Sequence, residues 1–390
     1  MTFHELGISE ALGAALTKQK ISEPTSIQRL AIPAIAEGRD VVVTSETGSG
    51  KTLSYLLPLM GRLDLKQEST QLVVLAPTHE LAIQIQRQAC DLALHSGMAV
   101  RTLLLIGGTS LDRQLEKLKK KPHIAVGSPG RIRELMAMGK LKAQTVRAVV
   151  LDEADTLLGR ESLEAVGKIV SAVPKERQLV FVSASDPKGC LEQVSAWAPQ
   201  HVAIRAGAAP VNERIEHLFV VCEERDKPDV LRRLVHAMGP ERGLAFVHRN
   251  HRAEEVASKL AHHRIPTTDL HGAFDKTERK RAMDDFRQGR ARIMIASDVA
   301  ARGLDIPGVT HIFNLDAPSD SQAYLHRVGR TARAGAAGTA VSLFTEQETR
   351  LVRRYEQELG IRLTQVRLRE GRVWPVEAGG MGQGAAGAGR

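Results

Sequence analysis

The segment Asp40-Val41-Val42-Val43-Thr44-Ser45-Glu46-Thr47-Gly48-Ser49-Gly50-Lys51-Thr52 decides the fold class of this chain. Its valine run predicts a buried strand, and residues 51–62 predict the helix that follows. A glycine-rich turn between a strand and a helix directs backbone N–H groups toward a bound phosphate. Lys51 adds a positive charge, and the Thr52 hydroxyl can reach Mg²⁺. The segment therefore predicts a strand–turn–helix unit that binds the phosphates of a nucleotide.

A second apolar run, Ala148-Val149-Val150-Leu151, ends directly in Asp152-Glu153-Ala154-Asp155. This order places a carboxylate at the end of a strand, where it can hold a metal ion. Glu153 beside it can orient or deprotonate a water molecule. A glycine-rich loop alone is also typical of an ordinary tight turn. The acids at a second strand end favour a single site for a magnesium-bound nucleoside triphosphate.

Strand-like runs alternate with amphipathic helical patterns along the chain, which is typical of βαβ units and a parallel sheet. Aromatic residues make up only 3% of the chain, so the cores must be mainly aliphatic, as in parallel sheets buried on both faces. We expect an α/β fold. The expected strands lie at residues 41–44, 72–76, 101–106, 124–126, 148–152, 179–183, 202–204, 217–221, 243–247, 292–296, 310–314 and 339–344. The expected helices include residues 80–95, 111–120, 252–262, 277–287 and 346–359.

The chain length of 390 residues suits two domains. A segment of small residues at 205–210 interrupts the pattern, and residues 379–390 are nearly all Gly and Ala. We therefore expect an N-terminal domain at 1–206, a linker at 207–214, a C-terminal domain at 215–365 and a short flexible tail at 366–390.

Composition limits the function classes. The formal net charge of +9 and the pI near 9.6 are compatible with a polyanionic partner without proving one. The basic run at residues 117–121 is better explained as a solvated helix end. The three cysteines show neither zinc spacing nor a disulfide framework. No signal peptide or membrane-length apolar run is visible, so we expect a soluble, cytoplasmic protein and a monomer.

The second half contains His326-Arg327-Val328-Gly329-Arg330-Thr331-Ala332-Arg333. Arg330 and Arg333 are three residues apart on a predicted helix, where such neighbours share a face. Both could then point at a γ-phosphate as arginine fingers, which stabilise charge in the transition state. The alternative is a surface helix with local salt bridges. The segment Ile295-Ala296-Ser297-Asp298 and the residues to Asp305 add small and polar positions suited to backbone contact.

With these motifs in this order, the chain resembles the DEAD-box family of ATP-dependent RNA helicases over about residues 3–360. The resemblance implies two tandem RecA-like domains, each a mainly parallel sheet flanked by helices, with the ATP site in the cleft between them. It implies RNA-dependent ATP hydrolysis, with ATP and Mg²⁺ as cofactors, coupled to local unwinding of short RNA duplexes or remodelling of RNA–protein complexes. The RNA would be bound through its backbone and without sequence specificity. An ATP-gated RNA clamp with little unwinding is the alternative, and a P-loop ATPase acting on protein or small molecules is a third.

The resemblance also implies roles for individual residues. The implied catalytic residues are Lys51, Asp152, Glu153, His326, Arg330 and Arg333. The implied ATP-binding residues are Phe3, Gln28, Thr47, Gly48, Ser49, Gly50, Lys51, Thr52 and Asp305, and Mg²⁺ would be held by Thr52 and Asp152, partly through water. The implied coupling residues are Asp155, Ser183 and Ser185. The implied RNA-binding residues are Pro77, Thr78, His79, Gly107, Gly108, Ser128, Pro129, Gly130, Arg131, Gly272, Arg279 and Ser297.

Several positions depart from the family pattern. His79 replaces an arginine, and a mostly neutral imidazole grips a phosphate less well. We expect weaker RNA affinity that improves below about pH 6.5. Lys20-Ile21 replaces a Gly-aromatic pair, which predicts weak ATP affinity, while Lys276 replaces a glutamine and Ala332 a glycine.

Overall fold

The chain forms two compact units in a computed structural model. The structure describes residues 1–45, 49–183, 191–205, 213–248, 250–270, 276–301, 306, 308–318, 320–332 and 336–376. One unit consists mainly of residues 1–209, and the other of residues 210–301 and 306–390. The division between them falls inside the segment expected to be the linker. No helix in the described part of the chain is long and apolar enough to cross a membrane.

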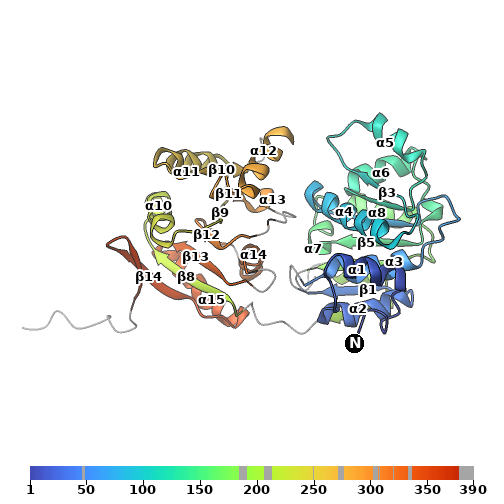
Figure 1. The fold of residues 1–390 in the computed structure, drawn as a ribbon, viewed down its shortest axis with the longest axis horizontal. Coiled ribbons are helices and arrows are strands. Elements are labelled where there is room, and N and C mark those ends of the chain that lie inside the picture. Colours follow the sequence, from blue (N-terminus) through green and yellow to red (C-terminus); the bar gives the residue numbers. More distant parts are fainter. Residues whose placement is uncertain are drawn as a thin grey trace, which may run out of the picture. The chain divides into compact units, whose positions relative to one another are not determined.

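The first unit is a parallel sheet covered by helices on both faces (Figure 1). Its strand order is β3-β4-β2-β5-β6-β1-β7 within the described residues. The strands are β1 Val41–Thr44, β2 Leu72–Leu75, β3 Thr102–Leu105, β4 Ile124–Gly127, β5 Ala148–Asp152, β6 Gln178–Ser183 and β7 Val202–Arg205. The helices are α1 Glu10–Lys18, α2 Ser26–Ala36, α3 Lys51–Gly61, α4 His79–Ser96, α5 Leu111–Leu118, α6 Pro129–Ala137, α7 Ala154–Leu157, α8 Leu163–Ala172 and α9 Leu191–Trp197, with a short 3₁₀ turn at Ala143–Thr145.

The sheet of the first unit separates two hydrophobic cores. In β1, Val41 and Val43 join one core and Val42 joins the other, because successive side chains of a strand point to opposite faces. The neighbouring strands are buried in the same way on both faces. This double burial explains why the strands appear in the sequence as continuous aliphatic runs.

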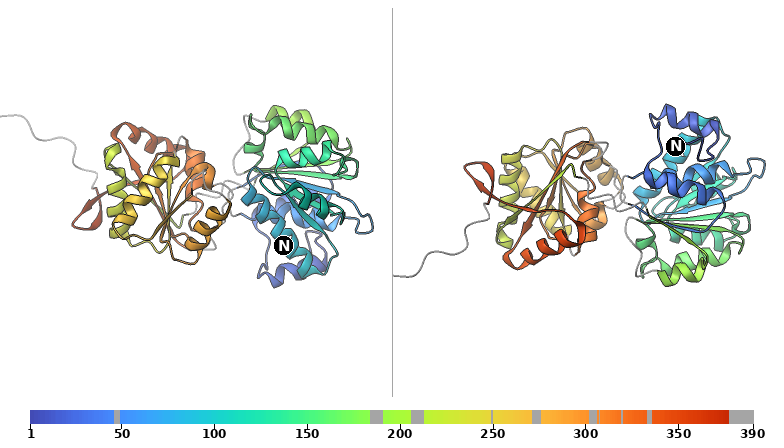
Figure 2. Two further views of the ribbon diagram at one scale, coloured as in Figure 1. Left: turned by 90° about the horizontal axis from the view of Figure 1, so that it is seen from above. Right: turned by 90° about the horizontal axis from the view of Figure 1, so that it is seen from below.

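The second unit contains a second mainly parallel sheet (Figure 2). Its strand order is β10-β11-β9-β12-β13-β8-β14-β15 within the described residues. The strands are β8 Ile215–Val221, β9 Gly243–Val247, β10 Thr267–Leu270, β11 Ile293–Ser297, β12 His311–Asn314, β13 Gly338–Phe344, β14 Thr364–Arg369 and β15 Arg372–Pro375. The helices are α10 Lys227–Met238, α11 Asn250–His262, α12 Lys276–Arg287, α13 Asp298–Ala301, α14 Ser321–Val328 and α15 Arg350–Leu359, with 3₁₀ turns at Glu224–Asp226 and Glu346–Thr349.

The structure corrects the expected start of the C-terminal tail. Residues 366–375 are not a flexible tail but belong to the antiparallel pair β14–β15, which extends the sheet beyond β8. Val366 lies in the core of this unit, and Leu368 and Val373 pack against it. Glu370 and Gly371 form the tight turn with φ values of 53° and 72°, as a two-residue hairpin of right-handed twist requires. Alternating arginines obscured this strand pattern in the sequence.

Several residues predicted for the nucleotide site of this unit lie at the carboxyl ends of neighbouring strands. In the parallel register, Asp152 of β5 is opposite Val182 of β6, and Thr44 of β1 is opposite Ser183. The carboxyl ends of the three strands therefore lie together, which is where open α/β sheets bind their ligands.

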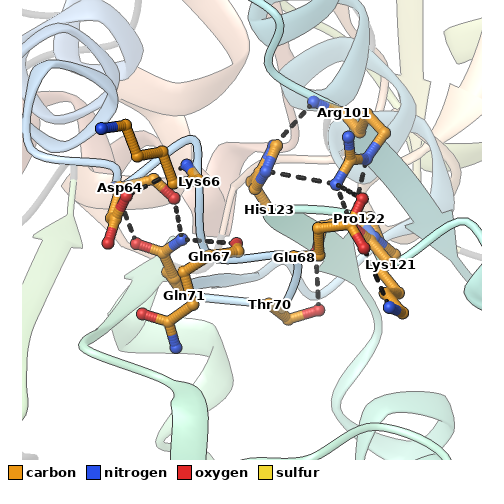
Figure 3. A network of polar contacts seen from close by, with 10 residues as sticks. All are labelled: Asp64, Lys66, Gln67, Glu68, Thr70, Gln71, Arg101, Lys121, Pro122 and His123. Atoms are coloured by element: carbon orange, nitrogen blue, oxygen red, sulfur yellow. Dashed lines mark hydrogen bonds and ion pairs between the residues drawn. The ribbon is translucent and has the colours of Figure 1, made fainter.

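At the amino ends of the strands in the same sheet lies a polar network that includes His123 and Arg101 (Figure 3). The backbone N–H of Arg101 donates to Nδ1 of His123 at 3.1 Å, and its guanidinium donates to the Lys121 carbonyl at 3.1 and 3.2 Å. The Thr70 hydroxyl donates to the Pro122 carbonyl at 2.9 Å. These bonds fasten the starts of β2, β3 and β4 to one another. The network satisfies buried polar groups and is structural.

The buried His217 makes the second unit sensitive to acid. Its Nδ1 is hydrogen-bonded to the Tyr324 hydroxyl at 2.8 Å, and burial lowers the pKa of the ring to about 4. The folded unit therefore favours the neutral ring, and its stability is complete above the unfolded pKa of about 6.5 and is lost as the pH falls toward 4. We expect a loss of about 2 kcal/mol between about pH 7.5 and about pH 5.

Hydrogen exchange of the β8 amides measures this loss in the intact chain. A His217→Gln variant retains a hydrogen-bonding side chain that does not titrate. The free energy of unfolding obtained from its exchange should therefore fall by about 2 kcal/mol less over the same pH range. Equal pH dependence in both proteins would contradict the assignment.

Candidate functional site

Gly50 begins α3 in a conformation that only glycine adopts easily. Its φ is 89°, and an added Cβ would lie 2.4 Å from Nε2 of Gln28. The same Nε2 donates to the Gly50 carbonyl at 3.0 Å, and the Thr25 hydroxyl donates to the Ser49 carbonyl at 2.7 Å. Close packing of α2 on the loop therefore shapes the phosphate-binding turn predicted from the sequence. The contribution of Thr25 was not predicted.

Gln28 is almost completely buried, and both ends of its amide are used. Its Oε1 accepts from the Thr25 backbone N–H at 3.0 Å as part of a capping box, while Nε2 holds Gly50. Gln28, which is expected to contact a base, thus also connects α2 to the glycine turn. Phe3, expected at the same base, is buried in the core beside α1 and α2.

Lys51 and Tyr55 lie on one face of α3, because positions i and i+4 are neighbours on a helix. The Lys51 ammonium donates to the Ser45 carbonyl. The Tyr55 hydroxyl donates to Oδ2 of Asp152 at 2.8 Å, and the Thr52 hydroxyl is hydrogen-bonded to Tyr55. Tyr55 is a site residue that the sequence analysis missed, although its spacing from Lys51 was a usable signal.

Asp152 is a buried carboxyl group at the end of β5. Burial raises its pKa, while the Tyr55 hydrogen bond and the Lys51 charge oppose that shift. Burial also raises the pKa of Tyr55 well above its usual value, so the phenol remains a donor. A buried carboxyl of this kind is an energetically unfavourable anion until a cation joins it. The residues present therefore fit a divalent metal ion.

Glu153 has a backbone conformation that is uncommon for its residue type. Its φ and ψ are 54° and 53°, and its N–H donates to Oδ1 of Asp152 at 3.0 Å. Its carbonyl accepts from Thr156 and Leu157, which starts α7. Left-handed non-glycine residues cost about 1–3 kcal/mol and concentrate at functional sites. This backbone turn joins the end of β5 to the start of α7 directly after Asp152.

Two of the three expected coupling residues, Asp155 and Ser183, lie at the same carboxyl ends of the strands. Asp155 is in α7, two residues after Glu153, and the Ser183 carbonyl accepts the Ser45 N–H at 3.1 Å. Six expected site residues lie outside the described residues: Thr47, Gly48, Ser185, Gly272, Asp305 and Arg333.

Three of the expected RNA residues of the first unit lie at the start of α4, and Gly107 lies next to them. Thr78 caps α4 by accepting from the Leu81 N–H at 3.2 Å, and Pro77 precedes it. The exposed His79 is the first residue of α4, and its Nε2 would lie 3.7 Å from a Cβ added to Gly107. Gly108 follows with φ of 63°. The fold thus brings together two segments that are almost thirty positions apart in the chain.

A second helix start carries Ser128, Pro129, Gly130 and Arg131. Ser128 is the residue before α6, Pro129 and Gly130 are its first two residues, and Gly130 is exposed. Arg131 pairs with Glu134 at 2.9 Å through Nε, and its buried Nη1 finds no hydrogen-bond partner within the described residues. Free N–H groups at a helix start and an unsatisfied guanidinium nitrogen are well suited to phosphate oxygens.

In the second unit, Arg279 and Ser297 meet at Ala300. The Arg279 Nη2 donates to the Ala300 carbonyl at 2.8 Å, and Ser297 Oγ accepts from the Ala300 N–H at 3.3 Å. The sequence predicted both residues for RNA binding but not their common contact with α13. Lys276, one of the departures from the family pattern, is the first residue of α12.

Arg327 is a buried and extensively hydrogen-bonded side chain near the expected finger residues. It lies in α14, is 1% exposed, and donates to both carboxylate oxygens of Asp298 at 2.6 Å. It also donates to the Asp316 carbonyl at 2.7 Å and lies 5.0 Å above the Phe246 ring. This residue was not among those predicted, because nothing in the motif distinguished it from the neighbouring arginines.

Arg330 does not lie on the predicted helix, and Arg333 lies outside the described residues. Helix α14 contains His326 but ends at Val328, and Gly329 follows as its C-cap. The backbone N–H of Arg330 donates to the Arg327 carbonyl at 3.1 Å in a turn. The helix therefore ends before Arg330, and the predicted helical spacing does not apply to this residue.

Comparisons with known proteins match both units. The DEAD/DEAH box helicase family model matches residues 25–192, and the helicase conserved C-terminal domain model matches residues 226–335. The chain is 40% identical over 360 residues to the DEAD-box ATP-dependent RNA helicase CshC of Bacillus cereus, covering 92% of each chain. The chain belongs to the DEAD-box family of ATP-dependent RNA helicases.

Other DEAD-box proteins extend the comparison. The chain is 37% identical to CshA of Bacillus cereus over 91% of its own length and 68% of that relative. It is similar to the structure of Saccharomyces cerevisiae Dbp5 bound to RNA and ADP BeF3, with a TM-score of 0.84, 29% identity, and coverage of 94% and 95% of the two chains. These matches confirm the expected family and the two RecA-like folds.

Two departures from the DEAD-box pattern occupy left-handed backbone positions. Lys20 has φ of 61° and Ala332 has φ of 54°, each where a glycine was expected. Lys20 follows the end of α1, which is at Lys18. Its N–H donates to the Thr17 carbonyl, and the Ile21 N–H donates to the Leu16 carbonyl, both at 2.9 Å. Glycine is the favoured residue at this helix end. Ile21 packs against the core of the first unit.

A Lys20→Gly variant should therefore be more stable than the natural chain. We expect a gain of about 1 kcal/mol, because the left-handed conformation costs about 1–2 kcal/mol in residues with a Cβ. Hydrogen exchange of the α1 amides measures it. A Gln19→Gly variant, one residue earlier at φ of −87°, is the matched control and should lose stability. A stability loss in both variants would contradict the prediction.

The Tyr55 hydroxyl is expected to affect the metal requirement of this DEAD-box protein. A Tyr55→Phe variant keeps the ring but removes the donor from Oδ2 of Asp152, so the pKa of that carboxyl should rise further. We expect the Mg²⁺ concentration for half-maximal ATPase activity to increase about tenfold. The acid limb of the rate–pH profile should also move upward. A uniform rate loss with unchanged Mg²⁺ and pH dependence would indicate a purely structural role.

Proposed function

We propose that the chain hydrolyses ATP in response to RNA and uses the cycle to separate short RNA duplexes locally. The relative CshC bears the name of an ATP-dependent RNA helicase, and the match covers 92% of both chains. The structure of the relative Dbp5 contains RNA and ADP BeF3. One observation carries the proposal. The start of α3, which has the pattern of a phosphate-binding turn, is linked by the Tyr55 hydroxyl to the buried Asp152, and Glu153 follows Asp152 at the end of β5.

The proposed chemistry assigns one task to each side chain. Lys51 binds the β and γ phosphates, exchanging its present hydrogen bond to the Ser45 carbonyl for phosphate oxygens. Glu153 orients the attacking water and accepts its proton. Arg330 and Arg333 remain our candidates for stabilising the charge that develops on the transferred phosphoryl group.

Magnesium is the metal that these residues fit. Mg²⁺ at phosphate sites takes one or two protein ligands and completes its shell with phosphate oxygens and water. Asp152, positioned by the Tyr55 hydroxyl and the Glu153 N–H, would supply one oxygen directly or through water. Thr52 would supply the second. Held there, Mg²⁺ would offset the negative charge of the ATP phosphates.

RNA would be bound through its backbone. Donors for phosphates lie at the starts of α4 and α6, at the glycines 107 and 108, and at the unsatisfied Nη1 of Arg131. These donors do not form a pattern that would distinguish one base from another. Affinity of this kind falls steeply with salt and depends little on sequence. The cytoplasmic location and the monomeric state expected from the sequence stay predictions.

One experiment tests the proposal. ATP hydrolysis is measured with and without a single-stranded RNA, and displacement of a short duplex is followed under multiple turnovers, with Glu153→Gln as the inactive reference. Strong stimulation with repeated duplex release is the expected result. Stimulation without release would make the protein an ATP-gated clamp, and hydrolysis indifferent to RNA would overturn RNA dependence altogether.

A further inference from the structure

The outer face of the β14–β15 hairpin displays three arginines and a tryptophan. Arg367 of β14 is opposite Trp374 of β15, and Arg369 is opposite Arg372. All four side chains are exposed, with Trp374 at 47%. The hairpin occupies the edge of the second sheet (Figure 2). We call these four residues the ribbon face.

The inner side of the hairpin holds the ribbon face in place. Val366 is buried in the core, Leu368 and Val373 pack against it, and both strands contact α10. Arg233 of α10 is exposed and donates to the Leu368 carbonyl at 3.4 Å, adding another guanidinium beside the hairpin. The ribbon face is therefore a shaped surface on a folded unit.

Charge and exposure distinguish this face from an ordinary protected sheet edge. Edge strands commonly carry charges that discourage pairing with other chains, which would account for the arginines alone. An exposed tryptophan works against such protection. Among the described residues of the hairpin, the one acid is Glu370, which pairs with Arg369 at 3.2 Å between side chains that are 78% and 68% exposed. Such a pair contributes little, so the arginines remain available to an anionic partner.

We propose that the ribbon face binds RNA outside the segment held by the helicase core. The arginines contact phosphates, and Trp374 stacks on an unpaired base. Paired phosphate and base contacts match single-stranded RNA better than an acidic protein, which offers no planar base to the indole. This inference rests on the proposed RNA-dependent function, and it adds a second contact surface to it.

Strand order sets the length of RNA that the two surfaces require. The ribbon face lies at the β15 edge, whereas Ser297 and Arg279 belong to elements at the opposite edge, next to β10. Seven spacings of about 4.8 Å separate β10 from β15, or roughly 34 Å. At about 3.4 Å per nucleotide along a stacked strand, this corresponds to about ten nucleotides. A stacked RNA shorter than this cannot contact both edges.

The test compares RNA binding by the full chain to single strands of about 8 and about 30 nucleotides, lengths on either side of the required span. In the triple variant Arg367→Gln/Arg369→Gln/Arg372→Gln we expect at least tenfold weaker binding of the long RNA and unchanged binding of the short one. The slope of log affinity against log salt for the long RNA should decrease by about 2, since each neutralised phosphate of a single strand contributes about 0.7. Trp374→Ala should weaken long-RNA binding about tenfold, and Trp374→Phe should largely restore it.

The matched control is Lys117→Gln/Lys119→Gln/Lys120→Gln, which removes the same charge from exposed positions near the end of α5. Equal losses in control and test variants, or no loss in the test variant, would overturn the proposal. Polyglutamate that displaces long RNA as effectively as unlabelled RNA would also overturn it in favour of an acidic protein partner. ATPase stimulation by the short RNA should be intact in every variant. Its absence in the unmodified chain would instead indicate failure of the proposed function.

Discussion

Replacing Glu153 by glutamine should lower the RNA-stimulated ATPase rate by about 10²- to 10⁴-fold, the range for loss of a general base. The amide has the size of the carboxylate but cannot accept a proton from water. The backbone N–H that Glu153 donates to Oδ1 of Asp152 is unchanged by this substitution. ATP binding should therefore persist, and the loss should appear in kcat rather than in KM.

Single-turnover hydrolysis at saturating ATP and RNA measures this effect, and ATP binding by equilibrium titration serves as the companion measurement. Glu161→Gln, at an exposed position eight residues later, is the matched control and should retain full activity. Residual activity above about a tenth in Glu153→Gln would remove Glu153 from the role of base. Another group would then have to accept the proton.

Replacing Arg327 by methionine should destabilise the second unit by about 3 kcal/mol. The substitution removes two hydrogen bonds to Asp298, one to the Asp316 carbonyl, one to Oδ1 of Asn314, and the contact with the Phe246 ring. The loss is moderated because Asp298 is 38% exposed and can be partly hydrated once its partner is gone. Because α14 also carries His326 and leads into Arg330, ATPase activity should fall as well.

Hydrogen exchange of β12 and β13 amides measures the change within the intact chain. Arg350→Met, at an exposed position in the first turn of α15, is the matched control and should change stability by less than about 0.5 kcal/mol. A double variant with Asp298→Asn should lose less than the sum of the two single losses, because both remove the same interaction. Full additivity would show that Arg327 acts without Asp298.

The sequence predicted the parts of the site that depend on local order. Asp152 follows four apolar residues, and Lys51 follows a glycine turn, so each was placed at the end of a strand or the start of a helix without knowledge of its neighbours. Hydrophobic periodicity is a local property, and it located most strands to within one or two residues. The polar edge strand β10 and the arginine-rich hairpin escaped it, because neither has a continuous apolar run.

The sequence by itself determined the α/β class and the family, and it predicted residues for a nucleotide site. Only the tertiary structure decided which side chains those residues meet. Tyr55 and Asp152 are 97 positions apart, and Asp298 and Arg327 are 29 apart, yet each pair is joined by hydrogen bonds. The pKa of Asp152 is raised mainly by burial, and burial depends on the elements that pack around this carboxyl group. Such long-range packing follows from the whole fold, whereas motifs and periodicities record only what lies next to a residue along the chain.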